Sequence, residues 1–398
     1  MASIDKVGAG YRVRYRTPDG RSRSQTFRLK VDAVRFANAK ETSKLTGTFV
    51  DPKLARKTFE DWWKEWREQR VDIRPSTRAR DDSYARNHIL PGLGRYTLGQ
   101  LDHAALQAWV AEMSAKDLAP ATVVKAAHIT SRCLRGAVKA RLIPFNPADG
   151  IDLPRVEAEE MRFLTPAQVD ALADAIDSRY RTFVLVGAYG GLRLGELAGL
   201  RRHRVDLMRG RIDVAEIVVE VRGHHVVGPP KTRAGRRSVP LPRFVTDALV
   251  DSTAGMAQSD LLFPSPHGGP LRASLFRRRV WQPACVAAGV GAWVTEEGGP
   301  WTSPEDGPRR YDGLRIHDLR HTAVALWIAA GASPKEVATR AGHSSVVTVL
   351  DRYGHLLPGS EDRVTDALDA MARSVTPGEA PSVVMLASAG EGRGVTRA

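Results

Sequence analysis

Two histidines stand four residues apart in the stretch His317-Asp318-Leu319-Arg320-His321, a spacing that places both on one face of a helix. Such a pair can share a zinc ion, but a hydrolytic zinc site also needs a third ligand and a general base. Asp318 is one methylene shorter than the glutamate that usually serves as that base. Arg320 shares the face, and its positive charge opposes a cation and favours an anion. The stretch therefore predicts an anion site rather than a metal site, with His321 as a structural residue hydrogen-bonded to its surroundings.

Four further stretches carry residues that could act on a phosphodiester. Two arginines would hold the negative charge that develops on the phosphate oxygens, because guanidinium groups are fixed bidentate donors and stay charged. A tyrosine, whose ordinary pKa is about 10, needs such a cationic site and a neighbouring histidine to act as a nucleophile. Taken singly, each stretch also fits a structural interpretation, as a helix end or a solvated turn. The stretches are GLRLGEL at 191–197, PPKTRAGRRSVPL at 229–241, AGHSS at 341–345 and DRYGH at 351–355.

In their order along the chain these stretches resemble the tyrosine recombinase family of bacteriophage integrases. The resemblance covers most of the chain and lies in the motifs themselves: GLRLGEL, HDLRHT, a Gly-His pair and a tyrosine ten residues beyond that histidine. The residues that match the catalytic set of the family are Arg193, Lys231, His317, Arg320, His343 and Tyr353.

The resemblance implies a role for each matching residue. Tyr353 would be the nucleophile, and Arg193 and Arg320 would hold the scissile phosphate. Lys231, on a hairpin turn, would be the general acid, and a basic surround that includes Arg237 should lower its pKa and help it protonate the departing 5′ oxygen. His317 and His343 would assist the reaction. Glu196 would have a supporting role, because it matches the acidic position after the first catalytic arginine of the family.

The activity implied by the resemblance is site-specific DNA recombination. DNA would be cleaved and rejoined through a 3′-phosphotyrosyl intermediate, so that DNA is integrated or excised between two attachment sites. The phosphotyrosine ester would store the energy of the cleaved bond, in keeping with the absence of an ATP-binding G-x-x-x-x-G-K-[ST] loop. No cofactor or metal is expected. Two alternatives stay open: DNA relaxation like that of type IB topoisomerases, which use a comparable set of residues, and DNA binding without catalysis.

The composition favours a nucleic acid as the partner. The 398 residues carry a formal net charge of +14, and residues 1–50 hold eleven lysines and arginines against four acidic residues, a net charge of +7. A large positive charge attracts polyanions by releasing their counterions. The longest apolar stretch, at 182–192, is too short to cross a bilayer, and the N-terminus lacks the apolar core of a signal peptide. With only Cys133 and Cys285, expected as buried apolar residues, the chain fits the reducing cytosol.

The start of the chain alternates apolar and basic residues. Tyr11, Val13 and Tyr15 alternate with arginines, which is the period of a half-buried strand with one basic face. A second basic strand is expected after the turn at 18–20, followed by a helix over 31–46. A basic ribbon of this kind can enter a DNA groove, although it can also be solvated surface. The DNA contacts expected here and further along the chain are Arg12, Arg14, Arg16, Arg21, Arg23, Lys125, Arg132, Arg135, Arg233 and Arg236.

The rest of the chain predicts two helix-rich regions. Aromatic residues at helical spacing begin the first, and Trp62 and Trp63 are expected in its core. Residues 289–313 predict a long loop or insertion, and the tail after 375 has no period and is expected to be disordered. Helices are expected at 76–89, 102–116 and 120–142 in the first region and at 165–177, 180–190, 243–251, 272–288, 315–330, 333–341 and 360–372 in the second, with three strands between 211 and 241.

These patterns predict a multidomain, mainly α fold with small β-sheets. By the resemblance, the N-terminal sheet-plus-helix domain would bind arm-type DNA sites, the all-helical domain would bind the core-type site, and an α+β domain would be catalytic. Four protomers would act as a homotetramer on double-stranded DNA in the host bacterial cytoplasm, and a DNA-bending protein and a directionality factor are left open as further partners. The expected boundaries are 1–50 for the arm-type DNA-binding domain, 51–57 for a linker, 58–150 for the helical core-binding domain, 151–162 for an interdomain linker, 163–374 for the catalytic domain and 375–398 for a disordered tail.

Overall fold

The computed structural model has many helices and several small sheets, which confirms the predicted fold class. The chain divides into two compact units, one made of residues 1–160 with 219–226 and the other of residues 161–218 with 227–398. The predicted domain boundaries remain predictions, and the tail at 375–398 and residues 51–53 of the linker lie outside the described residues. The structure describes residues 2–17, 20–45, 54–116, 118–157, 160–356 and 360–373.

A three-stranded antiparallel sheet covered by one helix forms the N-terminal part. The strands are β1 (Ser3–Val7), β2 (Gly10–Arg16) and β3 (Ser22–Phe27), in that order, and the helix is α1 (Lys30–Leu45). Along β2, Val13 and Tyr15 are buried whereas Arg14 and Arg16 are exposed, which confirms the predicted alternation. Strand β1 was not predicted, because its sequence SIDKV carries two charged residues and too few apolar ones to show a period.

The arginines of β2 and β3 do not all lie on one face of this sheet. Arg23 pairs with Tyr15 across β2 and β3, and residues directly opposite each other project from the same face. Arg23 therefore lies on the face of the buried Tyr15, which is opposite to the face of Arg14. Asp5 of β1 also places a carboxylate 3.6 Å from the Nε atom of Arg14.

Five helices build the second part of the first unit around an aromatic core. Trp62 and Trp63 are 2% and 4% exposed, which confirms their predicted place in the core, and the Trp62 indole donates to the carbonyl of Cys133 at 3.0 Å. Thr58 and Asp102 cap two of the helices by accepting backbone hydrogen bonds. The helices are α2 (Phe59–Gln69), α3 (Pro75–Tyr84), α4 (Leu90–Leu93), α5 (His103–Ala115) and α6 (Pro120–Lys139), with a π-helical turn at Ala85–Ile89 between α3 and α4.

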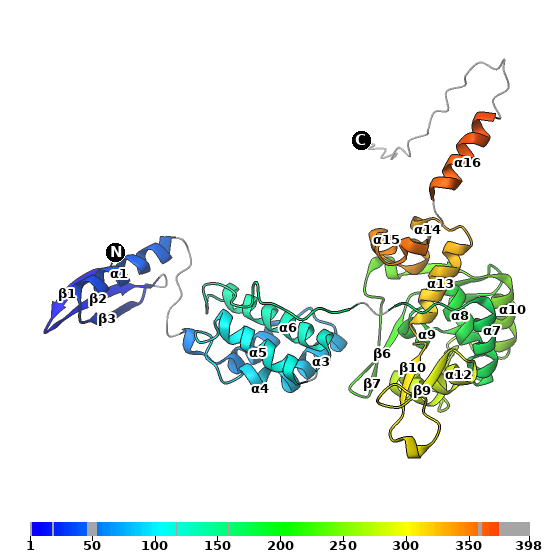
Figure 1. The fold of residues 1–398 in the computed structure, drawn as a ribbon, viewed down its shortest axis with the longest axis horizontal. Coiled ribbons are helices and arrows are strands. Elements are labelled where there is room, and N and C mark those ends of the chain that lie inside the picture. The colour runs from blue at the N-terminus through cyan, green and yellow to red at the C-terminus, as the bar shows by residue number, and fades with distance from the viewer. Residues whose placement is uncertain are drawn as a thin grey trace, which may run out of the picture. The chain divides into compact units, whose positions relative to one another are not determined.

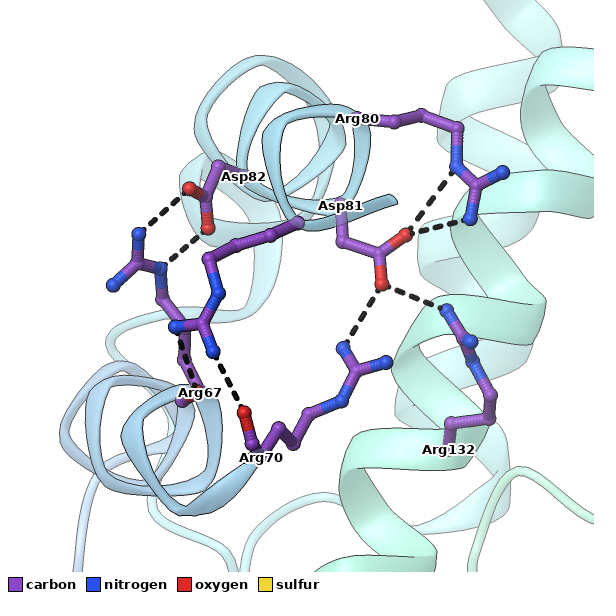
Figure 2. Close-up of polar contacts among 7 residues, drawn as sticks. Arg67, Arg70, Arg80, Asp81, Asp82 and Arg132 are labelled. Carbon is purple, nitrogen blue, oxygen red and sulfur yellow. Dashed lines mark hydrogen bonds and ion pairs between the residues drawn. The ribbon is translucent and has the colours of Figure 1, made fainter. Parts of the chain in front are cut away.

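Two nearly buried carboxylates on α3 connect three of these helices (Figure 2). Asp82 accepts from Arg67 of α2, at 2.8 Å from Nη2. Asp81 accepts from Arg70, next to the end of α2, at 2.9 Å and from Arg132 of α6 at 3.1 Å. Because α3 presents these carboxylates to arginines of its neighbours, the cluster fixes how α2, α3 and α6 pack. It also gives Arg132, which was predicted as a DNA contact, an ion-pair partner within the protein.

The second unit combines helices with short sheets (Figure 1). Its helices are α7 (Pro166–Ala175), α8 (Arg181–Gly190), α9 (Leu194–Ala198), α10 (Arg243–Ser252), α11 (Ala273–Phe276), α12 (Gln282–Ala287), α13 (Asp318–Ala329), α14 (Pro334–Ala341), α15 (Val347–Tyr353) and α16 (Ser360–Arg373). One sheet contains β4 (Val205–Asp206), β5 (Arg211–Val214) and β8 (Arg237–Pro240). A second contains β6 (Ile217–Val221) and β7 (His224–Gly228), and the turn between these two strands belongs to the first unit. A third contains β9 (Gly291–Val294) and β10 (Arg310–Gly313).

Helices α8 and α13 approach closely because glycine lies at their contact. A Cβ atom on Gly187 of α8 would lie 2.6 Å from a methyl carbon of the fully buried Leu319. Gly191, which follows α8, has a φ of 64°, and a Cβ atom there would lie 2.7 Å from the ring of Trp327. Glycine at 191 therefore satisfies both a left-handed turn and a close approach. The turn places the motif GLRLGEL against α13.

Residues 289–313 are more ordered than the predicted loop. β9 and β10 form an antiparallel pair in which Trp293 lies opposite Tyr311. The guanidinium of Arg309 lies 4.3 Å from the ring centre of Trp293 and 5.0 Å from that of Trp301. These two cation–π contacts stabilise the segment. Within the described ranges, no helix combines the length and apolar character needed to cross a membrane.

The Asp81 cluster predicts a local loss of stability in Asp81→Asn. The amide keeps the shape but loses the negative charge that holds Arg70 and Arg132, so local opening of α3 and α6 should become easier by about 1–3 kcal/mol. Hydrogen exchange of the amides of both helices measures this change. The exposed Asp72→Asn serves as the matched control, and equal exchange in the two variants would contradict the proposed role of the cluster.

Candidate active site

The loop between α8 and α9 is held by one buried carboxylate. Arg193 is the N-cap of α9, and Glu196 is the third residue of that helix. The backbone N–H of Arg193 donates to Glu196 Oε2 at 2.9 Å, and its guanidinium donates to Oε1 at 3.0 Å. A glutamate at this position satisfies a free N–H group at the helix start. Glu196 is only 2% exposed, so its charge must be balanced inside the protein.

Arg237 of β8 supplies the rest of that balance. It donates two hydrogen bonds to Glu196, at 3.1 and 3.0 Å, and its Nε–H donates to the carbonyl of Arg340 on α14 at 2.7 Å. Burial alone would raise the pKa of Glu196, but Arg237 and Arg193 outweigh that effect and hold the pKa below its ordinary range. Arg237 was predicted as part of a basic surround of Lys231; instead, its charge is paired with Glu196.

Arg320 ties α13 to two other segments. Its side chain is buried, and it donates to the carbonyl of Gly191 at 2.7 Å and to the carbonyl of Ala341 at the end of α14. Burial, followed by the charges of Arg193 and Arg237, lowers the pKa of Arg320 to about 9. The guanidinium therefore stays charged at neutral pH, and together these arginines make a fixed cationic site.

His343 contributes a neutral ring beside these cations. Gly342 ends α14 in the left-handed conformation, and the N–H of His343 donates back to the carbonyl of Ala338 at 2.9 Å. Burial and the charges of Arg320 and Arg193 lower the pKa of His343 to about 4. Its Nδ1 atom is buried and has no hydrogen-bond partner in the described part of the protein. A buried polar atom without a partner is rare and fits a position that a ligand fills.

Lys231 occupies an exposed loop rather than the predicted hairpin turn. The β6–β7 turn is made by Arg222 and Gly223, both with positive φ, whereas Lys231 follows β7. The loop lies against the end of α14, because a Cβ atom on Gly342 would be 2.8 Å from the carbonyl oxygen of Ala234. The Lys231 side chain is exposed and makes no hydrogen bond or ion pair with the described residues.

Tyr353 and His321 form a buried pair. Tyr353 ends α15 and is 2% exposed, and its hydroxyl lies 2.6 Å from Nδ1 of His321 on α13. Burial raises the pKa of Tyr353, and the charges of Arg320 and Arg352 oppose that rise only in part. The ring of His317 packs edge-on against His321, with centroids 4.9 Å apart. His321 was predicted to be a hydrogen-bonded structural residue; its partner proves to be the predicted nucleophile.

The predicted DNA contacts lie on several parts of the chain. Arg12, Arg14 and Arg16 follow β2. On α6, Lys125 is half-buried and Arg135 is exposed, with its guanidinium 3.7 Å from Asp149. The remaining positions are Arg21 ahead of β3, Arg23 on β3, Arg132 in the Asp81 cluster, and the exposed Arg233 and Arg236 beside Lys231.

The second unit thus gathers cations and neutral hydroxyl and imidazole groups at one place. Backbone carbonyls and Glu196 fix Arg193, Arg237 and Arg320, and the Tyr353 hydroxyl is hydrogen-bonded to His321. Such a set suits a phosphoryl group, because its transition state concentrates negative charge on oxygens that fixed donors can bind. Among the described residues, no group of three or more His, Cys, Asp and Glu side chains is arranged to hold a metal ion.

Two family models match the chain. Residues 162–359 match the phage integrase family, and residues 58–114 match the phage integrase N-terminal SAM-like domain. The putative prophage phiRv2 integrase of Mycobacterium tuberculosis is 28% identical over 378 residues, which span 90% of this chain and 92% of that protein. The integrase of Mycobacterium phage L5 is 26% identical over 364 residues, which span 88% of this chain and 91% of that protein.

Two solved structures share the fold. The Tn1549 transposon integrase, in complex with a circular intermediate DNA, matches with a TM-score of 0.64 and 19% identity over 79% of this chain and 99% of that one. A lambda integrase tetramer bound to a Holliday junction matches with a TM-score of 0.51 and 18% identity over 85% of this chain and 90% of that one.

The buried carboxylate predicts a pH-dependent effect of Glu196→Gln. The variant leaves Arg237 without a counter-charge, so at neutral pH the second unit should lose about 3 kcal/mol of stability. The pKa of Glu196 is lowered on folding from an ordinary 4.5, so its contribution is complete above 4.5 and is lost as pH falls through the lowered value. Hydrogen exchange of α9 and β8 at neutral and acidic pH measures the difference. A deficit that stays constant down to low pH, or that equals the deficit of the exposed Glu305→Gln, would contradict this assignment.

Proposed function

The chain belongs to the phage integrase family, and we propose that it is a tyrosine recombinase that integrates or excises DNA between two attachment sites through a 3′-phosphotyrosyl intermediate. The observation that carries this proposal is the grouping of Arg193, Arg320, His343 and Tyr353 in one unit. Burial and the charges of both arginines lower the pKa of His343, and the charge of Arg320 opposes the rise that burial causes in the pKa of Tyr353, so the four groups lie close enough to interact electrostatically.

The scissile phosphate would bind to the two arginines. Arg193 is 40% exposed and Arg320 is fixed by two carbonyls, so one guanidinium faces solvent while the other provides a buried charge. Both would donate to the non-bridging oxygens, whose negative charge grows as the nucleophile attacks. The unpartnered Nδ1 atom of His343 would be the third contact, provided that the neutral ring carries its proton on that nitrogen.

Tyr353 would attack the phosphorus once its proton has left. The Oη–P bond forms as the bond from phosphorus to the 5′ oxygen breaks, and Lys231 gives its proton to that oxygen. The 5′ hydroxyl of a second strand then attacks the phosphotyrosine and returns the proton to Lys231, so no external energy source is consumed. The exposed position of Lys231 supports this role, because the lysine can turn towards a bound DNA backbone.

Double-stranded DNA is the proposed substrate, with core-type and arm-type sites bound by different parts of the chain. The helical part and the second unit would bind the core site, using exposed cations such as Arg135, Arg233 and Arg236. The face of β2 with Arg14 and Arg16 would bind the arm site. Phosphate contacts of this kind set position rather than sequence.

The proposed assembly is a homotetramer on DNA in the bacterial cytoplasm. Its support is the lambda integrase structure, which is a tetramer bound to a Holliday junction, and the relation to phage and prophage integrases. Relaxation of a supercoiled circle by one protomer would be the alternative activity, and strand exchange between two linear duplexes separates the two. A DNA-bending protein and a directionality factor stay open as further partners.

Tyr353→Phe should bind DNA normally and form no covalent adduct, because the variant lacks only the attacking oxygen. A nicked core-site duplex traps the adduct, which a denaturing gel then measures. Tyr84→Phe, in the helical part, is the matched control and should form the adduct at the normal rate. Adducts at the normal level in Tyr353→Phe would contradict the assignment of the nucleophile.

Lys231→Ala should slow cleavage of ordinary DNA by about 10²–10⁴-fold, the usual contribution of a general acid. DNA with sulfur in place of the bridging 5′ oxygen releases a thiolate, which needs no proton, so the variant should cleave this substrate at the wild-type rate. Arg233→Ala, in the same exposed loop, is the control and should behave alike on both substrates. If sulfur fails to restore cleavage, Lys231 is not the acid.

A further inference from the structure

We propose that His321 positions the Tyr353 hydroxyl and accepts its proton during attack on the phosphate. This inference rests on the proposed function of Tyr353 and adds a residue to it. The observation is the 2.6 Å contact between the hydroxyl oxygen and His321 Nδ1, which joins α13 to α15 across 32 residues of sequence.

The direction of this hydrogen bond follows from the tautomer of His321, and the proposal requires the ring to carry its proton on Nε2. Both side chains are buried, with Tyr353 2% and His321 7% exposed, so water does not compete for the contact. A neutral imidazole with its proton on Nε2 offers a lone pair at Nδ1, and the phenol is then the donor. The hydroxyl has one proton and further lone pairs. It can donate to His321 while a lone pair meets the phosphorus.

The surroundings of His321 keep its ring neutral. Burial is the main reason that the pKa of His321 is lowered, and the charges of Arg352, Arg315 and Arg320 add to it, whereas Asp318 opposes them. A neutral ring is the form that accepts a proton.

His317 is the competing acceptor, and its position argues against it. Its ring packs edge-on against His321, and within the described residues it makes no hydrogen bond to Tyr353. More of its surface is exposed than that of His321, and the burial of the rest of the ring lowers its pKa as well. His317 can therefore face the phosphate while His321 serves the nucleophile.

The proton balance of the step closes within the site. In cleavage, the Tyr353 proton moves to His321 Nδ1, the Oη–P bond forms, and the 5′ oxygen leaves with the proton of Lys231. In rejoining, the attacking 5′ hydroxyl gives its proton to Lys231, and His321 returns its proton to the leaving Tyr353 oxygen. The two residues thus act on opposite sides of the phosphorus. Because Tyr353 is buried, DNA binding must also uncover its hydroxyl.

The test separates proton acceptance from packing by chemical rescue. His321→Ala should form the adduct about 10²–10⁴-fold more slowly than wild type, with unchanged DNA affinity. Added imidazole should restore a large part of the rate, because it fits the vacated space and accepts the proton. The loss should persist on the 5′-sulfur DNA that restores Lys231→Ala, because that substrate relieves only the leaving side. His321→Asn, which keeps a polar group of smaller size, should be slow as well and provides a second variant if the alanine protein unfolds.

Three outcomes would overturn the inference. These are an unchanged or faster rate in both variants, recovery of the loss by 5′-sulfur DNA, and a slow His321→Ala that imidazole does not accelerate. His203→Ala, which removes an exposed histidine far from Tyr353 in sequence, is the control for imidazole and should show no response. Adduct formation by Tyr353→Phe would instead refute the proposed function itself, so the two failures are distinguishable.

Discussion

The carboxylate of Glu196 is the constraint on which the arrangement of the site depends. It is buried between Arg193 and Arg237, and Arg237 extends the connection to the carbonyl of Arg340 on α14. The guanidinium of Arg320 lies close to these two arginines: burial, followed by their charges, lowers its pKa, and the charge of Glu196 opposes that effect. Without this carboxylate the three guanidiniums would repel one another more strongly. One acidic residue therefore allows the proposed phosphate-binding site to be assembled before any phosphate arrives.

Backbone carbonyls hold the third guanidinium, that of Arg320, in place. Arg320 donates to carbonyls at the end of α8 and of α14, so the side chain of Arg320 connects α13 to both of these helices. The close approach of α8 and α13 at Gly187 and the left-handed turn at Gly191 bring those carbonyls within reach. The geometry of the proposed site and the packing of the helices thus depend on the same contacts. Fixed donors of this kind need little reorganisation when charge develops on the phosphate.

Local patterns predicted much of the fold and most of the candidate site. The candidate residues Arg193, Arg320 and Tyr353 were predicted from the resemblance of their motifs to a known family, and the burial of Val13 and Trp62 was predicted from periodicity. The partners of these residues could not be predicted in this way. Glu196 and Arg237 are 41 residues apart and His321 and Tyr353 are 32 apart, so both pairings depend on tertiary packing. The side of the sheet on which Arg23 lies likewise depends on strand register, which the turn sequence alone does not fix.

The most direct test of the central claim is to identify the residue that DNA becomes attached to. The covalent complex formed on a nicked core site is digested with trypsin and nuclease, and the nucleotide-bearing peptide is sequenced by mass spectrometry. Cleavage after Arg352 and Arg363 gives a peptide that begins with Tyr353. We predict that this peptide carries a 3′-phosphonucleotide on Tyr353. A nucleotide on any other residue, or one attached through a 5′ phosphate, would contradict the account.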